Sequence, residues 1–229
     1  CIDRMLFDSN GEILSVRPTH FKEGRIHGAS SATTSSPTKV LLAGDYADPS
    51  IMRDGNDFYM THSPMNYSPG LLIWHSTDLV NWTPVCRPLH QPNDALWAPE
   101  MLKHNGRFYI YYPSAKKENY VIWADDIRGP WSEPVLTGVK GIDPGHVADA
   151  DGTRYLYTDK GAVTRLTPDG LKADGVADTV YAGWRYPRSW KTEGRSMYLE
   201  SPKIVKRGSY YYLVSAEGGT AGPPTSHMA

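Results

Sequence analysis

The stretch Asp54-Gly55-Asn56-Asp57-Phe58-Tyr59-Met60-Thr61-His62 decides the fold, because a polar glycine turn leads directly into a short run rich in aromatic residues. This pattern is typical of a β-hairpin. It recurs roughly every 50 residues, a period typical of propeller blades with four strands each. The four hairpin segments are residues 54–62, 105–112, 151–158 and 207–214. Helical periodicity is nearly absent, so the sequence predicts an all-β propeller.

Three segments entered through a proline precede these hairpins, and we interpret them as the innermost strands of blades. They are residues 48–52, 98–102 and 201–205. A proline at the first residue of a strand removes no hydrogen bond that the ladder needs. Residues 72–76 and 120–124 are predicted to be third strands. Between residues 44 and 229 the sequence therefore predicts three blades and the start of a fourth.

The remaining organisation suggests three parts. Residues 1–23 contain a single predicted hairpin, and residues 24–39 form a flexible linker rich in serine and threonine. Residues 40–229 contain blades 1 to 4, the last of them partial. Because an open propeller exposes strand edges, we expect another segment or a second chain to complete it.

Bulk composition excludes several partners. The net charge is -1 with no basic stripe, so nucleic acid is not expected, and no apolar run reaches the roughly 18 residues of a membrane span.

The aromatic and cysteine content is also informative. Fifteen Tyr and seven Trp outnumber four Phe, and Tyr and Trp can stack on sugars while hydrogen bonding, although most should fill strands. Cys1 and Cys86 define no disulfide framework. The compartment stays open, with a secreted or periplasmic location favoured if a signal has been removed.

Three acidic residues stand at or just before predicted innermost strands, namely Asp48, Asp143 and Glu200. Such strand starts converge on the axis of a propeller, so the three carboxylates should meet in one funnel. Glycoside hydrolysis needs one carboxylic acid and one carboxylate, and a third carboxylate can raise its neighbour's pKa by repulsion. The alternative is turn chemistry, because Asp before Pro is a common turn element.

Several motifs in this order resemble glycoside hydrolase family 43, the five-bladed propellers that include β-xylosidases, α-L-arabinofuranosidases and arabinanases. The resemblance covers residues 44–229. The matching motifs are Tyr-Ala-Asp-Pro-Ser at 46–50, His-Ser-Thr-Asp-Leu-Val-Asn-Trp at 75–82, Leu-Trp-Ala-Pro-Glu at 96–100, Ile-Asp-Pro at 142–144, Leu-Glu-Ser-Pro-Lys at 199–203 and Ala-Glu-Gly-Gly-Thr at 216–220.

The resemblance implies a role for each acid. Asp48 would be the general base, Asp143 the residue that modulates pKa and orients the acid, and Glu200 the general acid. The family inverts anomeric configuration, which predicts a separation of roughly 6.5–9.5 Å between base and acid. The expected substrate is a plant-type oligosaccharide or polysaccharide with terminal α-L-arabinofuranosyl or β-D-xylosyl groups.

Further candidate residues accompany the three acids. Trp97, Ser114 and His227 are candidate substrate-binding residues, with core packing the alternative for Trp97. Glu100 is interpreted as structural. No cofactor is required by the reaction, and the resemblance allows a structural calcium or sodium ion at the propeller centre.

The chain also departs from the family. A fifth blade is missing, and residues 1–20 resemble the segment that usually closes the catalytic domain, so the order looks circularly permuted. Two alternatives to an active hydrolase therefore stay open. One is a non-catalytic carbohydrate-binding propeller, and the other is a split half that is active only with a partner chain.

Overall fold

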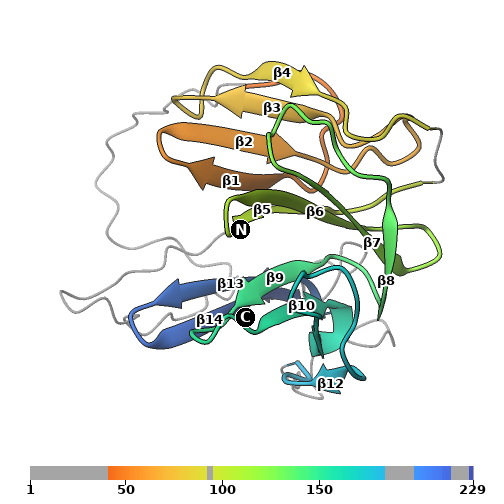
Figure 1. Cartoon of the computed structure of the whole chain (residues 1–229), viewed down its shortest axis with the longest axis vertical. Coiled ribbons are helices and arrows are strands. Elements are labelled where there is room, and N and C mark those ends of the chain that lie inside the picture. Colours follow the sequence, from red (N-terminus) through yellow and green to blue (C-terminus); the bar gives the residue numbers. More distant parts are fainter. Residues whose placement is uncertain (1–40, 92–94, 184–198, 218–226, 229) are drawn as a thin grey trace, which may run out of the picture. The chain divides into compact units, whose positions relative to one another are not determined.

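The structure is a computed structural model that describes residues 41–91, 95–183, 199–217 and 227–228 (Figure 1). The chain divides between Val40 and Leu41, and every described residue belongs to the second unit. The predicted hairpin at residues 1–23 and the linker at residues 24–39 lie outside the described residues, so both stay predictions.

Two four-stranded antiparallel sheets, each in sequence order, form the first half of the described fold. The first sheet consists of β1 (Ser50–Asp54), β2 (Asp57–Thr61), β3 (Ile73–Ser76) and β4 (Thr83–Cys86). The second consists of β5 (Glu100–His104), β6 (Arg107–Pro113), β7 (Glu118–Ala124) and β8 (Val135–Lys140). Each sheet is one blade, as the hairpin pattern predicted.

Two further sheets follow. The third blade consists of β9 (Gly145–Ala148), β10 (Arg154–Thr158), β11 (Ala162–Arg165) and β12 (Asp178–Thr179), with the short 3-10 turn η1 (Asp159–Gly161) between β10 and β11. The fourth consists of β13 (Leu199–Arg207), β14 (Tyr210–Glu217) and β15 (His227–Met228). The all-β prediction is confirmed. No helix in these described ranges is long and apolar enough to span a membrane.

The glycine turns occur where the sequence predicted them. Gly55, Gly106, Gly152 and Gly208 each lie between the first and second strand of a blade, with φ of 63°, 83°, 89° and 56°. These left-handed angles favour glycine because it has no Cβ. Each blade needs a residue with positive φ in this turn, which explains why glycine recurs at the same place in each repeat.

The second blade is buried on both faces. Ile110 and Ile122 pack with Leu71 in one core cluster, which joins the first and second blades. Their neighbours in sequence, Tyr111 and Val121, belong to a second cluster that joins the second blade to the third. Successive side chains of a strand point to opposite faces, so β6 and β7 serve both interfaces at once.

A fully buried arginine also joins the second and third blades. Arg154 is 1% exposed and its guanidinium donates hydrogen bonds to the His146 ring, the Asp169 carbonyl and the Tyr111 hydroxyl at 3.0, 2.8 and 3.1 Å. It also lies 4.3 Å from the ring centroid of Tyr109. These contacts satisfy a buried charge without a carboxylate partner.

The innermost strands lie beside one another from blade to blade. β5 contacts both β1 and β9, and β9 contacts β13. The segments that lead into these strands are therefore brought close together, which is the arrangement that the candidate acids require.

Candidate active site

The two candidate aspartates enter their blades through the same backbone geometry. Asp48 and Asp143 have φ of 51° and 55°, and each is followed by proline. Ser201 holds the equivalent position before a proline in the fourth blade, inside β13, with φ of 54°. Non-glycine residues in the left-handed region cost roughly 1–3 kcal/mol and cluster at functional sites. Asp is among the residues that tolerate this region best.

Glu200 lies one residue earlier, inside β13, where the strand is irregular. The register of β13 against β14 shifts between Glu200 and Lys203, which is a β-bulge. Bulges re-aim side chains beside active sites. The Ser215 hydroxyl donates to the Glu200 carbonyl at 2.9 Å, which fixes the backbone at the start of the bulge.

A direct hydrogen bond joins the Asp143 and Glu200 segments. The Ser201 amide donates to Asp143 Oδ2 at 3.1 Å. This bond lowers the pKa of Asp143, but burial outweighs it, and with the charges of Glu200, Asp48 and Asp159 it raises the pKa of Asp143 to about 6. The charges of Glu200, Asp48 and Asp159 thus act on Asp143, while the roles of the three candidate acids stay predictions.

The same surroundings act on Glu200. Burial raises the pKa of Glu200, the charges of Asp159 and Asp48 raise it further, and the ammonium of Lys117 opposes the shift. A raised pKa keeps a carboxylic acid protonated closer to neutral pH, which is the state that a general acid requires.

Asp159 is a fourth carboxylate that sequence reasoning missed. It is 9% exposed in η1, and its Oδ1 accepts the Ile142 amide at 2.9 Å while its own amide donates to the Ile142 carbonyl at 3.0 Å. Asp159 therefore anchors the residue directly before Asp143. Its sequence context, Asp-Lys-Gly, resembles an ordinary turn and gave no signal of this role.

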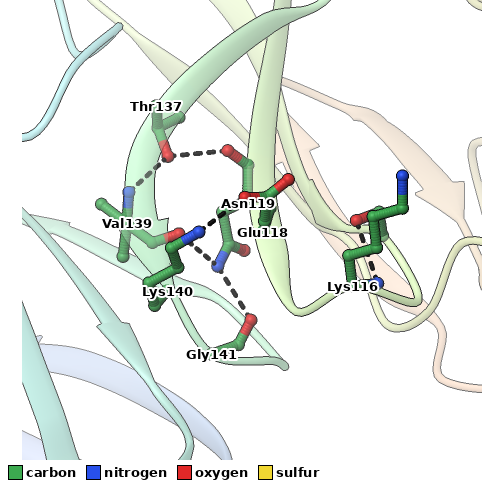
Figure 2. A network of polar contacts seen from close by, with 8 residues as sticks. Lys116, Glu118, Asn119, Thr137, Val139, Lys140 and Gly141 are labelled. Atoms are coloured by element: carbon green, nitrogen blue, oxygen red, sulfur yellow. Dashed lines mark hydrogen bonds and ion pairs between the residues drawn. The ribbon is translucent and has the colours of Figure 1, made fainter.

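A polar network on the second blade supports the same segment from the other side (Figure 2). The buried Asn119 amide donates to the carbonyls of Val139 and Gly141 at 3.3 and 3.0 Å, and the Gly141 amide donates to the Lys117 carbonyl at 3.0 Å. A Cβ on Gly141 would lie 2.5 Å from Asp159 Oδ1, so only glycine fits there. The loop before Asp143 is thus fixed by two blades.

The three candidate substrate-binding residues occupy different settings. Trp97 is half-buried, and its amide donates to the Pro113 carbonyl at 3.2 Å. Ser114 is 8% exposed, and its hydroxyl accepts the Lys116 amide at 3.3 Å in the turn that also contains Lys117. The backbone of His227, in β15, pairs with that of Glu217 in β14, and the side chain of His227 lies outside the described residues. Their contacts with substrate stay predictions.

Unpartnered polar atoms lie beside Asp48, at the end of β2. Thr61 Oγ1, His62 Nε2 and Ser63 Oγ are buried and have no hydrogen-bond partner within the described part of the chain. The Ser63 amide donates to the Ala47 carbonyl at 2.9 Å, which places this group next to the residue before Asp48. Buried polar atoms normally have a protein group or an ordered water as partner. The sequence gave no sign of these three residues.

Comparison with known proteins shows the family of this chain. The family model for glycosyl hydrolases family 43 matches residues 37–229. The chain belongs to this family. A xylosidase/arabinosidase 43B from Humicola insolens is 31% identical over 208 residues, covering 79% of this chain and 37% of the relative. The non-reducing end alpha-L-arabinofuranosidase BoGH43B from Bacteroides ovatus is 35% identical over 201 residues, covering 79% and 36%.

Solved structures support the fold of this family 43 chain. The crystal structure of the GH43 BlXynB protein from Bacillus licheniformis aligns with a TM-score of 0.70 and 29% identity, over 82% of this chain and 39% of that one. The chain therefore supplies part of a five-bladed propeller and spans less than two fifths of the length of the relatives named here.

A metal ion at the propeller centre finds no support in the described ranges. They contain no group of three or more His, Cys, Asp and Glu residues that could hold one. The calcium or sodium ion that the resemblance allowed stays a prediction.

Proposed function

We propose that this chain contains the active site of an inverting glycoside hydrolase that removes terminal α-L-arabinofuranosyl or β-D-xylosyl groups from oligosaccharides or polysaccharides. The observation that supports this most is the coupling among Asp48, Asp143 and Glu200. Burial and the charges of Glu200 and Asp48 raise the pKa of Asp143, and burial together with the charges of Asp159 and Asp48 raises the pKa of Glu200.

In the proposed reaction Asp48 and Glu200 act on opposite faces of the sugar ring. Asp48 accepts a proton from water as the water attacks the anomeric carbon. Glu200 donates its proton to the leaving oxygen as the glycosidic bond breaks. One displacement inverts the configuration, and proton transfers of this kind contribute roughly 10²- to 10⁴-fold each.

Asp143 has an indirect role in this scheme. It accepts the Ser201 amide next to Glu200 and adds negative charge to the site. The bond orients the Glu200 backbone, and the charge favours the protonated acid.

The names of the relatives support the substrate class. Several are named xylosidases, arabinosidases or an arabinofuranosidase. Because this chain covers under two fifths of them, activity is to be measured on the chain alone and together with any co-purifying chain. Cleavage only after mixing would support the split-half alternative, whereas sugar binding without cleavage in either form would support the carbohydrate-binding propeller.

The test is a panel of 4-nitrophenyl pentosides and hexosides with variants at the acid and the base. Glu200→Gln should lose activity on poor leaving groups by at least ~10²-fold and retain part of it on 4-nitrophenyl substrates, which need little protonation. Asp48→Asn should be inactive on both. NMR of the first-formed product reports its anomeric configuration. Undiminished activity of Glu200→Gln on a poor leaving group would remove this residue from the mechanism.

A further inference from the structure

Glu100, interpreted from sequence as structural, connects blades that are far apart in the chain. It is the first residue of β5, and its side chain is 15% exposed. Oε2 accepts a hydrogen bond from the Ser50 hydroxyl on β1 at 3.3 Å, and the same atom pairs with the Lys203 ammonium on β13. One carboxylate oxygen thus links the first, second and fourth blades.

The third blade joins the same group. Lys203 Nζ also donates to the Pro144 carbonyl, directly before β9, at 3.3 Å. Ser50 Oγ also accepts the Met101 amide at 2.9 Å, so one hydroxyl contacts both the Glu100 side chain and the Met101 backbone of the second blade. We call Ser50, Glu100, Pro144 and Lys203 the inner-strand cluster, because it joins the four innermost strands β1, β5, β9 and β13.

Each member outside the second blade lies within three residues of a candidate catalytic carboxylate. The neighbours are Asp48 with Ser50, Asp143 with Pro144, and Glu200 with Lys203. Lys203 also closes the bulge that begins at Glu200. A shift of β1, β9 or β13 would therefore also move the candidate acid at or just before its start.

We propose that Glu100 is a positioning residue for the active site, which holds Asp48, Asp143 and Glu200 at their working separation through the inner-strand cluster. This inference rests on the proposed hydrolase function. Catalysis is sensitive to such spacing, because a misplacement of about 1 Å can cost roughly 10²-fold in rate.

The chemistry of the cluster explains why a carboxylate stands at this position. Glu100 receives two donors, one of them a cation, from two different blades. Removal of Lys203 would leave the Glu100 carboxylate, which is 15% exposed, without its cation, whereas the ammonium of Lys203, at 41% exposed, would stay solvated without Glu100. An amide at position 100 could still accept both hydrogen bonds, although without the ionic attraction.

The chain offers a matched control. Lys103 pairs with Asp54 at 2.6 Å, which joins the same strands β5 and β1 at their opposite ends. The lysine side chains of the two pairs are similarly exposed, at 32% for Lys103 and 41% for Lys203. Lys103→Met and Lys203→Met therefore each remove one inter-blade ion pair, but only the second lies next to the acids.

The first readout does not depend on activity. Hydrogen exchange of the Ser201 amide, which donates to Asp143, reports the geometry of the site in the free protein. We expect Glu100→Ala and Lys203→Met to accelerate it at least ~10-fold, while Lys103→Met leaves it unchanged. On 4-nitrophenyl pentosides the same two variants should lose ~10- to 100-fold in kcat with little change in KM. For Glu100→Gln, both the exchange rate of the Ser201 amide and kcat should lie between the values for Glu100→Ala and those for the parent protein.

The outcomes test the positioning role of Glu100 separately from the proposed hydrolase function. Unchanged Ser201 exchange in folded Glu100→Ala and Lys203→Met, or equal acceleration in Lys103→Met, would overturn the positioning role. If Glu100→Ala does not fold, Glu100→Gln and Lys203→Met decide in the same way. An inactive parent protein would count against the proposed function, while the exchange comparison would still confirm or reject the structural role of Glu100.

Discussion

Replacement of Gly145 by alanine should separate two of the candidate catalytic residues by a calculable distance. Gly145 opens β9, two residues after Asp143, and an added Cβ would lie 2.0 Å from the carbonyl oxygen of Pro202, two residues after Glu200. Its backbone lies outside the left-handed region, so alanine adds no conformational strain of its own. The perturbation is therefore purely a contact between β9 and β13.

The size of the effect follows from that contact. Real Cβ atoms essentially never approach another heavy atom below 3.0 Å, so the two strands must move apart by at least about 1 Å. The bond from the Ser201 amide to Asp143 is already 3.1 Å long and would break. A displacement of this size predicts a loss of roughly 10²-fold in kcat on 4-nitrophenyl pentosides.

Gly152→Ala is the control for a general loss of stability. Gly152 lies in the turn between β9 and β10 with φ of 89°, and nothing lies within 4 Å of an added Cβ. Alanine there should lower the melting temperature through backbone strain but leave kcat unchanged. If Gly145→Ala keeps kcat within about threefold of the parent while its melting temperature falls, the reasoning about inter-strand spacing is wrong.

Two further changes test the electrostatics and the core. Asp159→Asn keeps an oxygen to accept the same backbone amide but removes a charge, so the pKa of Asp143 should fall below about 6 in a ¹³C NMR titration. Because that pKa is raised in the folded state, stability is lost as pH rises through it, and this loss should shrink in the variant; an unchanged titration would contradict the expectation. Arg154→Met should lower the free energy of unfolding in urea by ~3 kcal/mol and raise the pKa of His146, which burial and the Arg154 charge hold at about 3. Arg165→Met, at an exposed ion pair, should cost less than ~1 kcal/mol, and an equal cost for both would refute the role of the buried arginine.

The sequence allowed prediction of those features that depend on short local patterns. The glycine turns at Gly55 and Gly106 repeat because each hairpin needs the same left-handed angle, and this requirement is visible residue by residue. The same holds for Asp48 and Asp143, whose aspartate-proline pairs mark strand entries. Local geometry and local sequence are directly linked at these positions.

Contacts between blades were not predictable in this way. Glu100 meets Lys203, which lies 103 residues later, and nothing near either residue indicates the other. Asp159 acts by accepting a backbone amide, and any residue in a loop can supply that amide. Both roles arise only once the blades are packed, so a single sequence contains no periodic or local signal for them.

The position of Glu200 shows how the two kinds of information combine. In the first and third blades the acid occupies the left-handed site before proline, but in the fourth blade Ser201 holds that site and its amide donates to Asp143. The acid stands one residue earlier, inside a bulged strand, on a side chain that is one methylene longer. Under the proposed mechanism this displacement is useful, because the general acid must reach the leaving oxygen from the side opposite the base. The shifted register therefore distinguishes the proposed acid from the two aspartates, and the Ser201 amide that takes its place ties Asp143 to it.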